Sequence, residues 1–216
     1  MEDTGLKIAK ALLRIKAVKI DVKQPFTWTS GSKSPVYCDN RKILSYPDVR
    51  KSVYEAFAEM IRYLYPDTEI VAGVATGAIA HGALAAEASG LPFVYVRTSP
   101  KEHGAGNIIE GDLTERAKTV VIEDLISTGG SSLAAVEALR NAGAEVSGLL
   151  AIFDYGLDTA AENFKKAGCK VDALCDWHTL IEEAVKSDYV DESEIEILRK
   201  WRESPTEFGK TQTSAI

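Results

Sequence analysis

Continuous apolar runs alternate with helix-like periodic runs between residues 69 and 175, and this alternation limits the fold more than any other feature of the chain. The apolar runs lack the polar–apolar alternation of a strand with one wet face, so we expect helices to cover both faces of their sheet. Strands are predicted at residues 69–72, 92–96, 119–122, 146–153 and 171–174. The order of elements predicts an α/β protein with a doubly wound, mostly parallel five-stranded sheet flanked by helices.

The rest of the chain is predicted to surround this core as parts of one domain of 216 residues. Residues 1–46 should form an N-terminal helix and a small hood, in which 26–29 and 35–38 pair as a hairpin. A helix is expected at 47–65. The polar residues 203–216 show little periodicity and are expected to be a flexible tail.

Charge and cysteine content exclude several classes of protein. Lys and Arg number 25 against 32 Asp and Glu, a formal net charge of -7. The whole protein therefore offers no positive field for nucleic acid or an anionic membrane, and we expect neither as a partner; an anionic ligand needs a local cluster. Cys38, Cys169 and Cys175 form no C-x-x-C pair, which supports neither a disulfide framework nor a zinc site and predicts a cytoplasmic protein.

The strongest functional signal follows the third predicted strand. There the chain runs into two acids, Glu123 and Asp124, and then into hydroxyls and glycines that open a helix. Glycines let a backbone approach a ligand closely, and the N–H groups of a helix start attract anions. Ser127, Thr128 and Ser131 can add donors to phosphate oxygens, whereas the acids would repel phosphate and should face hydroxyls or a metal. A ligand with both a phosphate and a sugar diol would account for the two acids and the hydroxyls of this segment. Simple capping of the helix by Ser or Thr would leave the two acids unexplained.

Two other strand ends carry unusual residues. The Gly-rich turn at 73–79 either admits a ligand or only permits close packing of a helix on the sheet. After the second strand, the loop 97–111 carries Arg97, Lys101 and His103 with almost no apolar content, so we expect it to be mobile until a ligand orders it. Cations on such a loop suit an anion that must be enclosed, although a solvated surface loop is the alternative.

Together these segments resemble the orotate phosphoribosyltransferases, a branch of the type I phosphoribosyltransferases. The run from 120 to 132 looks like the family's motif for phosphoribosyl pyrophosphate (PRPP), and 26–41 resembles its N-terminal substrate hood. Residues 97–104 resemble its mobile catalytic loop, and 73–79 fits its pyrophosphate loop. The likeness covers 11–180 and is closest to the form found in Gram-positive-type bacteria.

The resemblance implies transfer of the 5-phosphoribosyl group of PRPP to orotate, giving orotidine 5′-monophosphate and pyrophosphate, with Mg²⁺ as cofactor. It implies catalytic roles for Asp124, Lys101 and His103. No all-protein metal site is expected, because PRPP would hold the Mg²⁺, with Glu123 and Asp124 reaching it directly or through water. The implied PRPP-binding residues are Arg97, Lys101, His103, Glu123, Asp124, Leu125, Ile126, Ser127, Thr128, Gly129, Gly130, Ser131, Thr76 and Gly77.

Orotate is an anion, so its carboxylate needs donors. Ser127 matches a family position that contacts the pyrimidine, but Tyr155 stands where enterobacterial members carry an arginine for orotate. We hypothesise that Lys33 and Arg41 supply the missing positive charge and that Tyr37 lies against the ring.

Some of these residues also have a purely structural interpretation. Arg41 can pair with Asp39 or Asp48 on the surface instead of binding orotate. His81 and His178 fall in helical patterns on or near apolar stretches, and we expect both to be structural.

The resemblance also implies a homodimer in which the loop 97–111 completes the neighbouring subunit's site. Two rival functions keep the fold: transfer to uracil or a purine, and a non-catalytic regulator that binds nucleic acid in response to PRPP. The hood sequence speaks against the first rival, and the charge of -7 with the retained basic loop speaks against the second.

Overall fold

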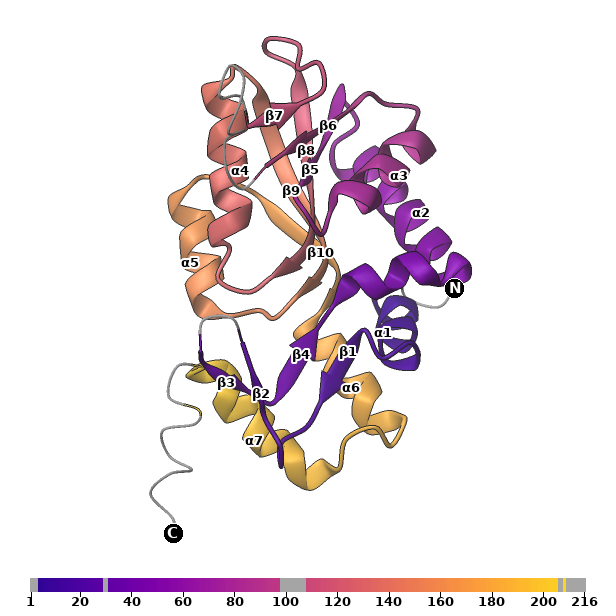
Figure 1. Ribbon diagram of the computed structural model, residues 1–216, viewed down its shortest axis with the longest axis vertical. Coiled ribbons are helices and arrows are strands. Elements are labelled where there is room, and N and C mark those ends of the chain that lie inside the picture. The colour runs from indigo at the N-terminus through magenta and orange to yellow at the C-terminus, as the bar shows by residue number, and fades with distance from the viewer. Residues whose placement is uncertain (1–3, 29–30, 98–107, 206–207, 209–216) are drawn as a thin grey trace.

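A six-stranded sheet forms the centre of the computed structural model, which describes residues 4–28, 31–97, 108–205 and 208 (Figure 1). The strand order is β10-β9-β8-β5-β6-β7, and all neighbours are parallel except β6 and β7. The strands are β5 (Ile70–Val74), β6 (Phe93–Val96), β7 (Ile109–Glu110), β8 (Lys118–Ile126), β9 (Glu145–Asp154) and β10 (Val171–Asp176). The five predicted parallel strands are confirmed. The sixth strand, β7, falls within the predicted loop 97–111, because a strand of two residues is too short to show an alternating pattern in the sequence.

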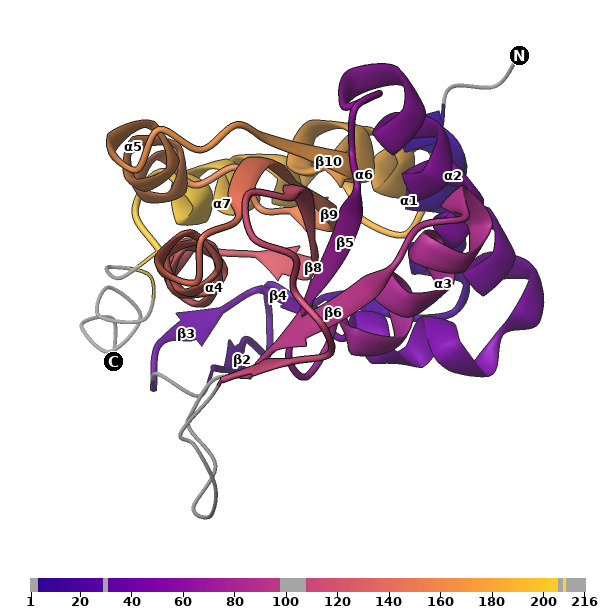
Figure 2. The same cartoon turned by 90° about the horizontal axis from the view of Figure 1, so that it is seen from above.

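Helices cover both faces of this sheet, as the uniformly apolar strands require. Every residue of β5 is buried, which is possible only with both faces covered. Figure 2 shows α2 and α3 on one side of the sheet and α4 and α5 on the other. No helix within the described residues has the length and apolar character needed to cross a membrane. The helices are α1 (Thr4–Arg14), α2 (Pro47–Leu64), α3 (Ile79–Ser89), α4 (Gly130–Asn141), α5 (Asp158–Lys166), α6 (Trp177–Lys186) and α7 (Glu192–Glu203).

The N-terminal hood is built from four very short strands and a 3₁₀ helix at Asn40–Ser45. In Figure 1 the strands lie beyond the lower ends of the central strands, between these and the helices α6 and α7. They are β1 (Val18–Ile20), β2 (Phe26–Thr27), β3 (Lys33–Ser34) and β4 (Val36–Cys38).

The pairing within the hood differs from the predicted hairpin. β2 pairs with β3, whereas β4 pairs with β1. The reason is that Pro35 has no backbone N–H and interrupts the ladder after β3. The chain beyond it turns to β1, where Val18 and Val36 become fully buried. The apolar core therefore overrides the local hairpin signal.

The order of the parallel strands fixes where a ligand can bind. The first of them along the chain, β5, lies between the second, β6, and the third, β8. The order reverses between β5 and β8, and open α/β sheets bind ligands beyond the carboxyl ends of the strands at such a point. The segments that follow β5 and end β8 are those that the sequence analysis singled out.

Candidate active site

A pocket of about 380 Å³ opens at this reversal point, between the ends of β5 and β8 and the hood segment that follows β4. It brings together residues that lie up to 93 positions apart, from Cys38 to Ser131. Among the predicted site residues, those that line it are Arg41, Thr76, Gly77, Glu123, Asp124, Leu125, Ser127 and Ser131.

The two adjacent acids of β8 have different surroundings. Glu123 is 4% exposed; its Oε2 accepts a hydrogen bond from Ser132 Oγ at 2.9 Å, and its Oε1 accepts one from the Asp124 N–H at 3.0 Å. Burial and the neighbouring Asp124 carboxylate raise the pKa of Glu123 well above its ordinary value. Asp124 is only half-buried. Glu123 is thus tied into the protein, and Asp124 is the acid available to a ligand.

Gly77 lets the Asp124 carboxylate lie against the turn after β5. A Cβ at Gly77 would fall 2.6 Å from Oδ1 of Asp124, and closer still to Oδ2 and Cγ, where ordinary contacts begin at 3.4 Å. Only a residue without a side chain can occupy this position while the carboxylate stays in place. The requirement for glycine here comes from close approach, and the Ala75–Thr76 peptide bond in the same turn is cis.

The turn from β8 into α4 forms the polar side of the pocket. Gly129 has φ +78° and precedes the first residue of α4, and a Cβ on it would meet the Phe164 ring at 2.7 Å. Ser127 and Ser131 line the pocket on either side of this glycine. The unsatisfied N–H groups of the first turn of α4 and these two hydroxyls are donors of the kind that binds a phosphate.

A buried network behind Asp124 was not predicted from the sequence. Asn40 is 1% exposed and donates from Nδ2 to the Asp124 carbonyl oxygen at 2.5 Å. The Cys38 thiol in turn donates to Asn40 Oδ1 at 3.3 Å, and burial with the charges of Asp124 and Asp39 raises the Cys38 pKa, which keeps the thiol protonated. His81, 1% exposed, lies beside this network, and burial lowers its pKa, so it is neutral. The hood is thereby bonded directly to the acid motif.

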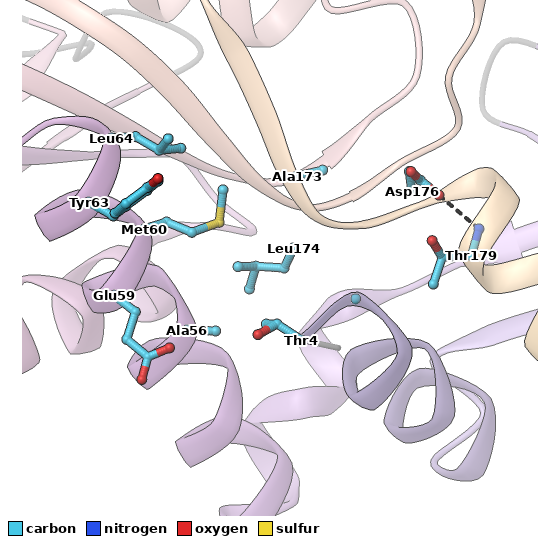
Figure 3. Close-up of a pocket in the computed structure, with 11 residues that line it drawn as sticks. Thr4, Ala56, Glu59, Met60, Tyr63, Leu64, Ala173, Leu174, Asp176 and Thr179 are labelled. Atoms are coloured by element: carbon cyan, nitrogen blue, oxygen red, sulfur yellow. Dashed lines mark hydrogen bonds between the residues drawn. The ribbon is translucent and has the colours of Figure 1, made fainter. Parts of the chain in front are cut away.

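A second hollow, of about 440 Å³, lies between α1, α2 and β10. Figure 3 shows Glu59 and Asp176 on opposite sides of it, with Met60 and Leu174 between them. None of the eleven residues that line it is basic. Among the described residues, this hollow therefore offers no positive charge to an anionic substrate.

Similarity to known proteins identifies the family. Residues 39–183 match the family described as the phosphoribosyl transferase domain. The chain is also 52% identical over 209 residues to the orotate phosphoribosyltransferase of Porphyromonas gingivalis, covering 97% of this chain and 100% of that relative. This chain belongs to the orotate phosphoribosyltransferase family.

Further comparisons agree with this family assignment. The orotate phosphoribosyltransferase of Lactococcus lactis subsp. lactis is 51% identical over 197 residues, 91% of this chain and 94% of that relative. The crystal structure of orotate phosphoribosyltransferase from Aeropyrum pernix superimposes with a TM-score of 0.71 at 29% identity, covering 85% of this chain and 99% of that chain. The chain is therefore a pentosyltransferase that carries the phosphoribosyl group of PRPP to orotate in pyrimidine biosynthesis, as the sequence predicted.

The hood residues assigned to orotate lie at different distances from the pocket. Arg41 lines it while its Nε donates to Asp39 Oδ1 at 2.6 Å, which lowers the pKa of Asp39. Lys33 instead donates to Thr27 Oγ1 at 2.7 Å, and the Tyr37 ring packs on a neighbouring phenylalanine. In the described part of the chain, neither Lys33 nor Tyr37 lines the pocket. Of the two surface partners considered for Arg41, Asp39 is the one observed.

Other predicted residues lie outside the pocket lining. Arg97 pairs with Glu110, the last residue of β7, at 3.4 Å. Tyr155, at the position of the enterobacterial arginine, is 1% exposed and packs among aromatic rings. Ile126 ends β8, Thr128 and Gly129 belong to the turn, and Gly130 begins α4; none of the four lines the pocket. Lys101 and His103 lie outside the described residues.

Proposed function

We propose that the pocket between β5 and β8 binds PRPP and that the hood holds orotate against it. The observation that carries this proposal is the position of Asp124. Its carboxylate faces the pocket, between a turn with the donors of a phosphate site and the glycine turn after β5. Donors on one side and an acid on the other match a ligand with a phosphate at one end and a diol next to it.

Each side of the pocket would act on a different part of PRPP. The N–H groups at the start of α4, with Ser127 and Ser131, bind the 5′-phosphate. Asp124 accepts hydrogen bonds from the ribose 2′- and 3′-hydroxyls, which fixes the sugar as positive charge develops at C1′. Glu123, held by Ser132, supports the Asp124 backbone from inside the protein. Binding of this kind stabilises charge that appears only as the C1′–O bond breaks.

The pyrophosphate needs more positive charge than the pocket contains. Arg41 is the one Lys or Arg among the twelve residues of the described chain that line the pocket, and Asp39 already neutralises part of its charge. We therefore assign the leaving pyrophosphate to Lys101, His103 and Arg97 of the loop 97–111. His103 would also donate a proton to it. These cations would come from the neighbouring subunit of a homodimer.

Magnesium is the proposed cofactor, and the residues present fit it. The pocket presents oxygen donors from Asp39, Glu123 and Asp124, the ligand type that Mg²⁺ prefers. Within the described residues, no three His, Cys, Asp or Glu side chains gather in a group that could hold a metal ion. PRPP oxygens and water would therefore provide most of the ligands, with Asp124 in contact directly or through water and Glu123, whose two oxygens already accept hydrogen bonds, through water alone. The ion would neutralise part of the pyrophosphate charge.

Orotate would bind on the hood side, next to C1′ of the ribose. Ser127 donates to the pyrimidine, and Arg41 pairs with its carboxylate after releasing Asp39. Lys33 and Tyr37 lie further out on β3 and β4 and would form the outer part of the orotate site. A cytoplasmic location is also proposed, since Cys38, Cys169 and Cys175 are all free thiols.

A spectrophotometric assay with orotate, uracil and hypoxanthine tests the substrate assignment. Consumption of orotate alone, dependent on PRPP and Mg²⁺, is expected. Arg41→Ala tests the hood, because a lost charged hydrogen bond costs ~1.5–3 kcal/mol and should raise KM for orotate or lower kcat by about tenfold or more. Values of both constants within twofold of wild type would remove Arg41 from the site.

A further inference from the structure

The C-terminal helix α7 lies beyond the family match, which ends at residue 183, yet it is joined to the hood. In Figure 1, α7 lies at the lower end of the molecule, below the central strands. Its buried side chains are Leu198 and Trp201, and Trp201 has no exposed surface. The position of α7 on the protein thus depends largely on what Trp201 contacts.

Trp201 packs against three aromatic rings from separate parts of the chain. Its ring centroid lies 5.8 Å from that of Trp28 in the hood, with the planes nearly perpendicular. It lies 5.6 Å from Tyr155, just after β9, and 5.2 Å from Trp177, the first residue of α6. The pairs with Trp28 and Tyr155 are edge-to-face, an arrangement that is favourable beyond the surface it buries.

The aromatic cluster reaches the pocket through Trp28 and Tyr155. Trp28 Nε1 donates to the carbonyl oxygen of Val36, the first residue of β4, at 3.2 Å. Tyr155 lies beside Cys38, the last residue of β4 and part of the pocket lining, and burial together with the neighbouring Cys38 raises the pKa of Tyr155. The Tyr155 backbone is in turn fixed by the sheet, since its N–H donates to Ile126 at 3.1 Å. Residues that contact Trp201 thus lie against both ends of β4, and one of them, Trp28, is hydrogen-bonded to it.

The hood needs such support because its own strands are short. β2 and β3 have two residues each, and β1 and β4 have three. Two-stranded pairs of this length are not stable on their own in water. Their position over the pocket must therefore come from packing against other parts of the protein.

We propose that Trp201 is a positioning residue that holds the orotate side of the pocket in place through Trp28 and Tyr155. This rests on the proposed assignment of orotate to the hood. The PRPP side belongs to β5, β8 and the start of α4, which are held by the central sheet. Loss of the Trp201 ring should accordingly weaken orotate binding and leave PRPP binding nearly unchanged. The packing of the supporting residues determines how precisely a site residue is positioned.

The test measures KM for both substrates, kcat and the thermal unfolding midpoint. Trp201→Ala should raise KM for orotate at least fivefold while KM for PRPP stays within twofold. Trp201→Phe keeps an aromatic ring and removes an indole N–H that has no hydrogen-bond partner among the described residues, so both KM values should stay within twofold. Leu198→Ala removes the other buried side chain of α7 and is the matched control. It should lower the unfolding midpoint and leave KM for orotate within twofold.

Three results would overturn the proposal: an unchanged KM for orotate in Trp201→Ala, an equal rise in both KM values, or an equal rise of KM for orotate in Leu198→Ala. Should Trp201→Ala fail to fold, Trp28→Phe replaces it, because it removes the bond to Val36 and keeps a ring. A threefold or larger rise in KM for orotate is then expected, and no rise contradicts the proposal.

Arg41→Ala distinguishes a failure of the Trp201 proposal from a failure of the assignment of orotate to the hood. If it alone raises KM for orotate, the hood binds orotate without Trp201; if neither variant does, the hood assignment itself is wrong.

Discussion

Replacing Gly77 by alanine should disable the enzyme by moving Asp124. The new Cβ would lie 2.6 Å from Oδ1 of Asp124 and closer still to Oδ2 and Cγ, whereas an ordinary contact begins at 3.4 Å, so the carboxylate has to retreat by at least about 0.8 Å. Misplacement of a reacting or binding group by about 1 Å can reduce the rate by ~10²-fold. We therefore expect kcat/KM for PRPP to fall by about 100-fold, or about 2.7 kcal/mol of transition-state stabilisation.

A double-mutant cycle with Asp124→Ala shows whether Gly77→Ala acts through the carboxylate. Consumption of orotate is followed spectrophotometrically for wild type, both single variants and the double variant. If the added methyl group acts by displacing Asp124, Gly77→Ala has little further effect once that side chain is gone. A full 100-fold loss in the Asp124→Ala background would refute the reasoning, as would a Gly77→Ala enzyme with wild-type kcat/KM.

The remaining predictions concern charge. Asp124→Asn should lower kcat/KM by at least ~10-fold, about 1.4 kcal/mol, because an amide cannot accept hydrogen bonds from the diol with both of its groups; steady-state kinetics check this, and a smaller loss contradicts the role. Lys101→Ala should lower kcat more than it weakens PRPP binding, since its charge matters most as the pyrophosphate leaves, and equal losses would count against that role. Mixing inactive Lys101→Ala and Asp124→Asn subunits should restore part of the activity if loops act across a dimer, and no recovery argues against sharing. Burial raises the pKa of Asp154, so folding favours the protonated form of this side chain. The stability that this preference gives the folded protein is present at low pH and is lost as the pH rises above the ordinary aspartate pKa. The thermal unfolding midpoint of Asp154→Asn should therefore rise relative to that of the wild type as the pH increases from 4 to 8. A midpoint difference that stays constant over this range would contradict the prediction.

The central sheet and the acid motif could be predicted from the sequence because each depends on neighbouring residues. Uniformly apolar runs reveal strands covered on both faces, and the position of Glu123 and Asp124 at the end of such a run indicates a site. The difference between the two acids was not predictable. It depends on Ser132 and on burial under α4, which the order of residues does not show.

Long-range contacts account for what the sequence analysis missed. Asn40 bonds to a carbonyl 84 positions away, and nothing in its local sequence marks that partner. The pairing of β4 with β1 instead of β2 follows from burial of Val36 in the core, which outweighs the turn signal in the hood. Tyr155 was considered only as a replacement for an arginine, whereas it is buried among aromatic rings supplied by both ends of the chain.

A crystal structure of the protein with PRPP and Mg²⁺ tests the central claim most directly. The account predicts the ribose 2′- and 3′-hydroxyls within hydrogen-bonding distance of the Asp124 carboxylate and the 5′-phosphate on the turn between Ser127 and Ser131. A PRPP molecule bound elsewhere, or one with its 5′-phosphate on the glycine turn at Gly77 and its diol away from Asp124, would contradict it.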